Sequence, residues 1–335
     1  MFRTEIEIAP GDSRIKYGDQ LLFLGSCFSD EIGRRMTNFK FGGLINPFGI
    51  VYNPASIARS LDHIISDKTF RASDLLFHNE QWLSLDHHSS FSDKSKRKCL
   101  SNINQQLQKS RVLLSNCNWL CITLGTAFTF FHKQSEQVVA NCHRLPTDAF
   151  EKNMLNLQET KWSLSQALLR VREVRPDMQV LFTVSPIRHW REGAVANMKS
   201  KAVLLTAIHE LEEELDYVHY FPAYEIMMDD LRDYRFYKSD MLHPNETAVA
   251  YIFKKFIGSH ISEECYGAMM GIEKLQKAMN HRPRNPRSKA HVSFLQHQIL
   301  YLEQLEQEWP SLSFRAERSY FETELYNHGK GHPIA

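Results

Sequence analysis

Leu21-Leu22-Phe23-Leu24-Gly25-Ser26-Cys27-Phe28-Ser29 is the stretch from which the fold of this chain can be read. Its first four residues are apolar, which is the length of a short buried strand, and Gly25 ends the run. Acidic residues follow at positions 30 and 31, where negative charge stabilises the first turn of a helix. The stretch therefore predicts a buried strand, a tight turn and a helix that extends to Met36.

The same alternation of strand and helix continues as far as residue 257. Further buried strands are predicted over 119–124, 179–184 and 217–221, which end at Gly125, Ser185-Pro186 and Pro222. Helices are predicted over 54–65, 158–175, 194–216 and 244–257. Apolar strands separated by amphipathic helices predict an α/β fold with a parallel sheet covered on both faces. Ligands of such folds bind at the carboxyl ends of the strands.

The pattern changes after residue 258. Residues 281–287 are polar, basic and interrupted by prolines, which is typical of a linker, and a helix is predicted from His291 to Trp309. Its apolar stripe consists of Leu295, Ile299, Leu302, Leu305 and Trp309. We interpret the stripe as docking on the main domain, or alternatively as pairing with a second copy in a homo-oligomer. The predicted organisation is a main domain over 1–258, a helical extension over 259–325 and a flexible tail over 326–335.

Composition excludes several classes of protein. The chain has 335 residues of which 43% are apolar, enough for a substantial core. Its 40 basic and 39 acidic residues leave a net charge of +1, which gives no support for a nucleic-acid partner. No apolar run approaches the about 20 residues that cross a bilayer, and the first residues lack the apolar core of a secretory signal. We therefore expect no membrane association and a cytoplasmic location. The cysteines include no Cys-x-x-Cys pair, which fits reduced thiols.

Two segments carry residues that suit nucleophilic catalysis. In the first, Ser26 and Cys27 stand between a strand end and a helix start, where the turn exposes a side chain and helix N–H groups can stabilise an oxyanion. The alternative interpretation is a helix-capping serine beside a buried cysteine. In the second, Asp240 and His243 precede Pro244. There the carboxylate can orient the imidazole, and the imidazole can accept the proton of a nucleophile.

Together with these segments, further stretches resemble the GSCFA family, named for the motif seen here as Gly25-Ser26-Cys27-Phe28-Ser29, with Ser29 in place of Ala. These stretches are Asn46-Pro47-Phe48-Gly49-Ile50-Val51-Tyr52-Asn53-Pro54, Leu124-Gly125-Thr126-Ala127-Phe128, Asn141-Cys142-His143-Arg144-Leu145-Pro146 and Ser185-Pro186-Ile187-Arg188-His189. The resemblance covers roughly residues 20–255. The GSCFA family is similar to the wider SGNH, or GDSL-like, hydrolase group. This implies a flavodoxin-like three-layer α/β/α sandwich, followed here by the C-terminal helical extension.

The resemblance also implies an activity. Most members of the wider group are esterases, including many that remove acetyl groups from carbohydrates, and some relatives transfer acyl groups. It implies hydrolysis of an O-acyl ester of a small molecule or carbohydrate through a nucleophile–His–Asp triad, with no cofactor and no metal. The alternatives are an acyltransferase with the same triad and a non-catalytic module that binds a carbohydrate or another ligand.

The triad is carried over by residue. The group's late Asp-x-x-His run matches Asp240 and His243 directly. Matching the group's Gly-Asp-Ser block on Gly25 makes Cys27 the nucleophile, whereas the group's usual chemistry favours Ser26. We favour Cys27 slightly and expect a nearby imidazole and the helix N-terminus to lower the pKa of its thiol.

The oxyanion donors match the group less well. The group uses a glycine N–H from a second block, for which Gly43 or Gly49 is expected here. It also uses an asparagine side chain from a third block, which matches Gly125-Thr126-Ala127 and contains no Asn. Thr126 or Asn46 is expected to take that place.

Several polar residues in the family stretches have two interpretations. His143 and His189 are expected either to line the pocket and contact a polar substrate or to hold loops through hydrogen bonds. Arg188 and Arg191 are expected either to bind an anionic group or to be solvated at the surface.

Overall fold

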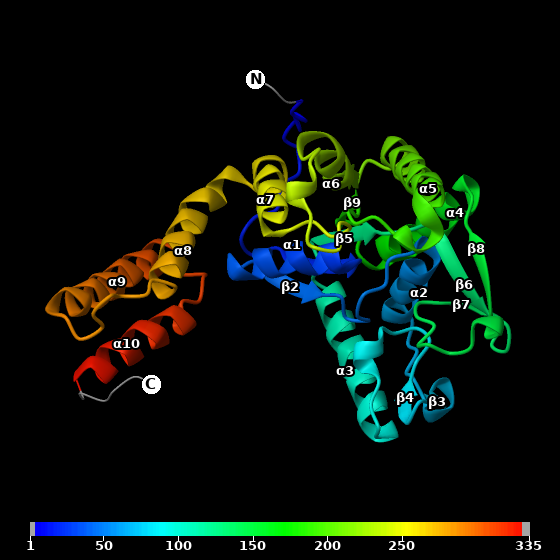
Figure 1. Ribbon diagram of the computed structural model, residues 1–335, viewed down its shortest axis with the longest axis horizontal. Helices are drawn as coiled ribbons and strands as arrows, with labels where there is room; N and C mark the ends of the chain where they lie inside the picture. Colours follow the sequence, from blue (N-terminus) through cyan, green and yellow to red (C-terminus); the bar gives the residue numbers. More distant parts are fainter. Residues whose placement is uncertain (1–3, 330–335) are drawn as a thin grey trace.

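The computed structural model describes residues 4–329 and places a five-stranded parallel sheet at their centre (Figure 1). The strands are β1 (Gln20–Gly25), β2 (Gly42–Ile45), β5 (Trp119–Leu124), β9 (Gln179–Val184) and β10 (Val218–Tyr220). They lie in the order β10-β9-β5-β1-β2, which is the flavodoxin-like order 2-1-3-4-5 when the strands are counted along the chain. The order reverses between β1 and β5, and the carboxyl ends of these two strands are where such folds bind ligands.

Helices cover both faces of the sheet, which confirms the predicted three-layer α/β/α sandwich. One face packs against α2 (Pro54–Ile65), α3 (Lys96–Leu114), α4 (Leu157–Val174) and α5 (Gly193–Glu214). The other packs against α1 (Cys27–Asn38), the short α6 (Ala223–Glu225) and α7 (Glu246–His260). Strand β1 shows the division, because Leu22 and Leu24 belong to the first core, whereas Leu21 and Phe23 belong to the second.

Local capping chemistry fixes where the helices begin. The side-chain oxygens of Ser26, Asn53 and Asn245 accept backbone N–H groups at the starts of α1, α2 and α7, and Pro54 occupies the first turn of α2. The starts of α2 and α7 lie within two residues of the predicted ones, and α1 begins at Cys27, directly after the predicted turn.

Two small antiparallel sheets and α3 were not predicted from the sequence. One sheet pairs β3 (Leu76–His78) with β4 (Gln81–Leu83); the other has the order β7-β6-β8, from β6 (Phe128–His132), β7 (Gln137–Val139) and β8 (Phe150–Met154). Short 3-10 helices span Ala72–Asp74, Ser89–Phe91, Thr147–Ala149, Trp190–Glu192, Tyr234–Phe236 and Glu263–Cys265, and a π-helical turn spans Ile226–Asp230.

Three C-terminal helices project from the end of the sandwich opposite the small sheets (Figure 1). They are α8 (Tyr266–Met279), α9 (Lys289–Glu308) and α10 (Arg315–Gly329). The predicted stripe on α9 packs within this extension, because Leu295, Leu302 and Leu305 share a core with side chains of α8 and α10. Neither interpretation of the stripe included this packing, and a homo-oligomer stays a prediction. Of the predicted tail, residues 326–329 continue α10, and residues 330–335 lie outside the described residues.

The extension contacts the sandwich at the C-terminal end of α1. Gln276 donates a hydrogen bond to the carbonyl of Asn38 (2.7 Å), and Phe39 packs against the core of the extension. Lys40 and Glu317 form an ion pair (2.8 Å) whose side chains are both largely buried. Across residues 4–329, no helix has both the length and the apolar character needed to cross a membrane.

Candidate active site

The turn after β1 requires glycine and is held by Asn46. A Cβ on Gly25 would lie 2.4 Å from the carbonyl oxygen of Thr123 on the neighbouring strand, so no other residue fits there. Asn46 accepts the backbone N–H of Gly25 through Oδ1 (2.8 Å) and donates through Nδ2 to Asp30 of α1 (2.5 Å). Asn46 therefore joins the turn to the first helix turn, and its amide is engaged in structural hydrogen bonds.

Ser26 and Cys27 face different surroundings. Ser26 is 3% exposed, and its Oγ accepts the backbone N–H of Phe28 (3.2 Å) as the N-cap of α1. Cys27 is partly exposed and lines a cavity of about 100 Å³ together with Glu31, Lys238 and His243. Ser26 does not line this cavity. The structure thus brings Cys27 to His243 and leaves Ser26 in the capping position that the alternative interpretation gave it.

Asp240 holds His243 in one orientation. Its Oδ2 lies 2.6 Å from Nδ1 of His243, and its Oδ1 accepts the backbone N–H groups of Leu242 and His243, both at 2.9 Å. These backbone donors are the main reason why the pKa of Asp240 falls to about 2, and the His243 side chain adds to the effect. A charged carboxylate only accepts hydrogen bonds, so Nδ1 carries a proton and Nε2 is left to act as a base.

Cys27 is a protonated thiol in this setting. Burial raises the pKa of Cys27 above its ordinary value; the backbone N–H of the same residue and Lys238 lower it, and Asp30 and Glu31 raise it. The prediction of a lowered thiol pKa is therefore wrong in its net direction, because burial outweighs the backbone N–H at the helix N-terminus. Because a thiol must lose its proton to become a nucleophile, the cavity needs a base, and the imidazole of His243 lies there.

The third family block forms a closed network beside this cavity. The N–H of Gly125 donates to the carbonyl of Tyr52 (2.8 Å). The hydroxyl of Thr126 lies 3.0 Å from that of Ser200 and accepts the N–H of Phe128 (3.2 Å). Thr126 is buried, and the network occupies the hydroxyl that was expected to serve an oxyanion.

His189 is a polar side chain near this block whose Nε2 has no hydrogen-bond partner among the described residues. Its ring stacks on Tyr52, with centroids 5.0 Å apart, and its Nε2 would lie 2.9 Å from a Cβ on Gly125. Nε2 is buried and has no hydrogen-bond partner within residues 4–329. Burial, together with the nearby charges of Lys201 and His243, lowers the pKa of His189 to about 4. At neutral pH His189 is therefore an uncharged imidazole.

Of three other predicted site residues, one lies away from the Cys27 cavity and two form hydrogen bonds within loops. Gly43 pairs with Leu21 at the start of β1, so the structure places it at the opposite end of the strand from Cys27. Gly43 is therefore too far along the strand to donate to an oxyanion at Cys27, and the expectation that it does so is wrong.

Gly49 and His143 hold loops. The N–H of Gly49 donates to the carbonyl of Asn46 (2.7 Å) inside a tight turn. Nε2 of His143 lies 2.8 Å from the carbonyl of Ser84 and 3.0 Å from that of His87. For His143 the described contacts are those of the loop-holding alternative.

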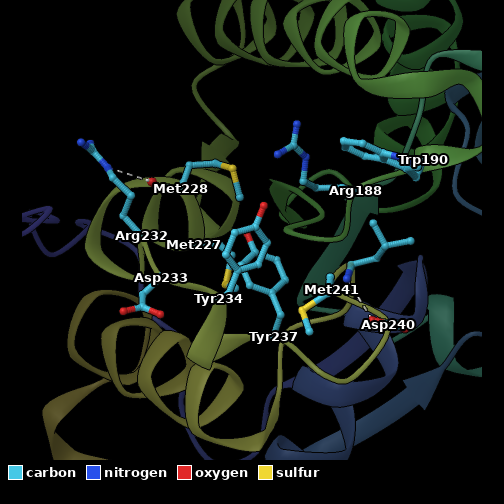
Figure 2. Close-up of a pocket in the computed structure, with 11 residues that line it drawn as sticks. Arg188, Trp190, Met227, Met228, Arg232, Asp233, Tyr234, Tyr237, Asp240 and Met241 are labelled. Atoms are coloured by element: carbon cyan, nitrogen blue, oxygen red, sulfur yellow. Dashed lines mark hydrogen bonds between the residues drawn. The ribbon is translucent and has the colours of Figure 1, made fainter.

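A larger cavity, of about 510 Å³, opens beside Asp240 (Figure 2). Arg188 and Trp190 line it from the segment after β9, and Tyr234 and Tyr237 line it from the segment before Asp240. Trp190 and the two tyrosines were not among the predicted site residues, because only the fold joins these segments. Within residues 4–329, no group of three or more His, Cys, Asp or Glu side chains is arranged to hold a metal ion.

Family models match two parts of the chain: residues 20–256 match the GSCFA family, and residues 272–327 match the C-terminal domain of GSCFA domain proteins. The chain belongs to the GSCFA family. No curated protein matches the sequence.

Solved structures similar to this GSCFA protein include two esterases. A family 3 carbohydrate esterase from Clostridium thermocellum is 15% identical, with a TM-score of 0.33, and the match covers 73% of this chain and 95% of that one. An acetyl xylan esterase from the rumen bacterium Butyrivibrio proteoclasticus is 13% identical, with a TM-score of 0.30, and the match covers 72% of this chain and 63% of that one.

Lys201 is the residue of the GSCFA site that sequence analysis missed most clearly. Its side chain is completely buried, and Nζ donates to the carbonyls of Gly125 (2.8 Å) and Ser185 (2.7 Å), which join the carboxyl ends of β5 and β9. Burial lowers the pKa of Lys201 to about 7, and a thiolate at Cys27 would oppose that shift. The signal was present in the sequence, because position 201 shares the buried face of α5 with Leu204 and Ile208.

Proposed function

We propose that this protein hydrolyses O-acyl esters, with Cys27 as nucleophile, His243 as general base and acid, and Asp240 as the carboxylate that orients His243. One observation carries the proposal: an imidazole fixed by a carboxylate shares a cavity with a cysteine at a helix N-terminus. Membership of the GSCFA family and its resemblance to the SGNH group support the same reaction class.

The reaction follows from these groups in two halves. Nε2 of His243 takes the Cys27 proton as sulfur attacks the acyl carbon, and the protonated imidazole then gives that proton to the departing alcohol oxygen. The products of this half are a thioester on Cys27 and a free alcohol. In the second half Nε2 takes a proton from water, the hydroxyl attacks the thioester, and the carboxylic acid leaves as the proton returns to sulfur.

The developing oxyanion needs hydrogen-bond donors near the sulfur. The backbone N–H of Cys27, at the start of α1, supplies the first donor in the proposal, because the N–H of Phe28 is already accepted by Ser26 (3.2 Å). The neutral His189 supplies a second donor in the proposal, because its buried Nε2 is unpartnered within the described residues and the charge of His243 acts on its pKa. This replaces the asparagine that the third block lacks. Removing one such donor typically costs about 10²–10³ in kcat.

The test is trapping of the acyl-enzyme. The protein is mixed with 4-nitrophenyl acetate, quenched with acid, and analysed by intact-mass spectrometry and peptide mapping, alongside Cys27→Ala, Ser26→Ala and His243→Ala. We expect an acetyl group on Cys27 in the wild type and in Ser26→Ala. We also expect about 10²–10⁴ slower acylation in His243→Ala.

The variants of the adjacent residues Ser26 and Cys27 distinguish the two candidate nucleophiles. Ser26→Ala should lose only about 1 kcal/mol of stability, as expected for a helix cap. Acetylation of Ser26 would contradict the proposal. So would a wild-type protein that is acylated no faster than Cys27→Ala. Adding glycerol tests the acyltransferase alternative: acetylglycerol among the products would indicate transfer rather than hydrolysis.

A further inference from the structure

We propose that the cavity of about 510 Å³ beside Asp240 binds the anionic part of a charged ester substrate, and that Arg188 receives its carboxylate or phosphate group. The inference rests on the proposed function for the reaction, but it concerns recognition and is tested separately by binding. It names the substrate class as an O-acyl ester whose alcohol part carries both a ring and an anionic group.

The position of the cavity connects it to the reacting groups. Asp240, Met241 and Leu242 form part of its wall, and the next residue along the chain is His243, which faces the Cys27 cavity. Consecutive residues of one short loop thus line the two cavities. The volume of the larger one is within the range of small-molecule sites, about 300–1,000 Å³. A ligand held in it can present an ester oxygen to His243.

The charge of Arg188 is not balanced by the protein. No carboxylate within residues 4–329 forms an ion pair with it, and its Nε is buried without a hydrogen-bond partner. Its guanidinium instead lies 5.3 Å from the ring centroid of Trp190 and adds to the positive charge around Lys201. Buried donors are normally satisfied, and a guanidinium is suited to a bidentate carboxylate or phosphate. A bound anion would supply the missing hydrogen-bond acceptor and reduce the repulsion between the positive charges of Arg188 and Lys201.

The other charged groups of the cavity already have partners. Arg232 forms an ion pair with Asp229. Of the two carboxylates in the wall, Asp240 binds His243, and Asp233 accepts the backbone N–H of Arg235 (2.9 Å). Among the charged side chains that line this cavity, Arg188 is therefore the one without an ion-pair partner within residues 4–329, and it can pair with a ligand.

Aromatic side chains complete the cavity. Trp190 is 50% exposed and Tyr234 is 74% exposed, and Figure 2 shows the rings of Tyr234 and Tyr237 close together below Arg188. Exposed aromatic rings in a cavity offer flat apolar faces with a polar edge, which suit the face of a sugar or aryl ring. The combination of flat rings and one unbalanced guanidinium favours a cyclic anion over a neutral sugar.

Binding is measured first, by isothermal titration calorimetry on the full chain carrying His243→Ala, so that no turnover interferes. The probes are glucuronic acid, glucose 6-phosphate and glucose, which separate carboxylate, phosphate and neutral ring. We expect at least one anion to bind about ten- to hundredfold more tightly than glucose. Arg188→Met should abolish that difference and Arg188→Lys should restore part of it.

Arg191→Met is the matched control, because Arg191 is an exposed arginine three positions along that does not line the cavity. It should leave the preference for the anion unchanged. Equal affinity for glucose and both anions, no binding of any probe, or an equal loss in Arg191→Met would each overturn the inference.

Hydrolysis then separates this inference from the proposed function. The wild type and Arg188→Met are compared on 4-acetoxybenzoate and on its uncharged methyl ester. Arg188→Met should lower kcat/KM for the charged ester about tenfold or more relative to the uncharged one. Arg188-dependent anion binding without hydrolysis of either ester would remove the proposed function alone. Hydrolysis of both esters with no effect of Arg188→Met would remove the inference alone.

Discussion

The Asp240–His243 pair and the Asp86–His63 pair contain the same two side chains in different surroundings. In the first, Nδ1 and Oδ2 are 2.6 Å apart and the side chains are 45% and 40% exposed. In the second, Nε2 and Oδ2 are 3.2 Å apart and the side chains are 10% and 8% exposed. The first pair adjoins two cavities, whereas the second lies in the core beside α2.

The partners of each pair explain what it can do. Asp86 also binds the guanidinium of Arg59 (2.6 Å), and the His63 ring lies among aromatic rings, with the centroid of Phe70 at 5.1 Å. No substrate can approach that imidazole. The side chain of His243, in contrast, lines a cavity that Cys27 also lines. An Asp–His pair therefore indicates catalysis only where the second nitrogen of the imidazole is accessible to a substrate or nucleophile.

The same substitution in both pairs gives the sharpest contrast. Asp240→Asn keeps the shape of the side chain but removes the charge that sets the orientation and tautomer of His243. We expect kcat/KM for 4-nitrophenyl acetate to fall by about 10²–10⁴. The free energy of unfolding should stay close to that of the wild type, because the site is exposed. Steady-state kinetics and urea unfolding measure the two effects, and a loss of stability without loss of rate would reverse the assignment.

Asp86→Asn should act on stability instead. It leaves the Arg59 and His63 side chains without their shared carboxylate, and breaking such a buried pair costs about 3 kcal/mol. Urea unfolding followed by circular dichroism measures this. Activity per folded molecule should equal that of the wild type. An unchanged unfolding midpoint would show that the buried pair contributes nothing to the fold.

Acid should destabilise the region around the buried pair by a smaller amount. Burial holds the pKa of His87, next to Asp86, at about 3, against an ordinary value of 6.5. The unfolded chain therefore binds a proton below pH 6.5 that the folded protein takes up only near pH 3, and stability is lost as the pH falls between these values. One such group costs about 2 kcal/mol at pH 5.

The variant His87→Phe isolates this effect. Its free energy of unfolding, measured by urea titration from pH 7 to pH 5, should fall less steeply with acid than that of the wild type. Parallel pH profiles for the two proteins would assign the acid sensitivity to other groups.

The central sheet was predictable because its signals are local. Each of the three long central strands is an apolar run that ends at a glycine or at Ser185-Pro186. The edge strand β2 was missed because Gly42-Gly43-Leu44-Ile45 is short and half glycine. The β7-β6-β8 sheet was missed because its strands mix polar and apolar residues on a partly exposed surface.

The site was predictable only where its geometry is local. Asp240 and His243 are three residues apart, so their contact needs little more than one turn of chain. The register that removes Gly43 from the site depends on how two strands align. The raised pKa of Cys27 depends on burial, which the motif alone does not encode. Lys201 was detectable, since a lysine on the buried face of a helix calls for an internal acceptor.

The C-terminal extension contacts α1 at the end opposite the candidate nucleophile. The extension binds the chain at Asn38 and Lys40, just where α1 ends, and Cys27 is its first residue. A helix of this length is a stiff rod about 18 Å long. The contacts of the extension and the sulfur of Cys27 therefore lie at opposite ends of the same helix. Gln276 of α8 and Glu317 of α10 thus fix the end of α1 that lies farthest from the sulfur.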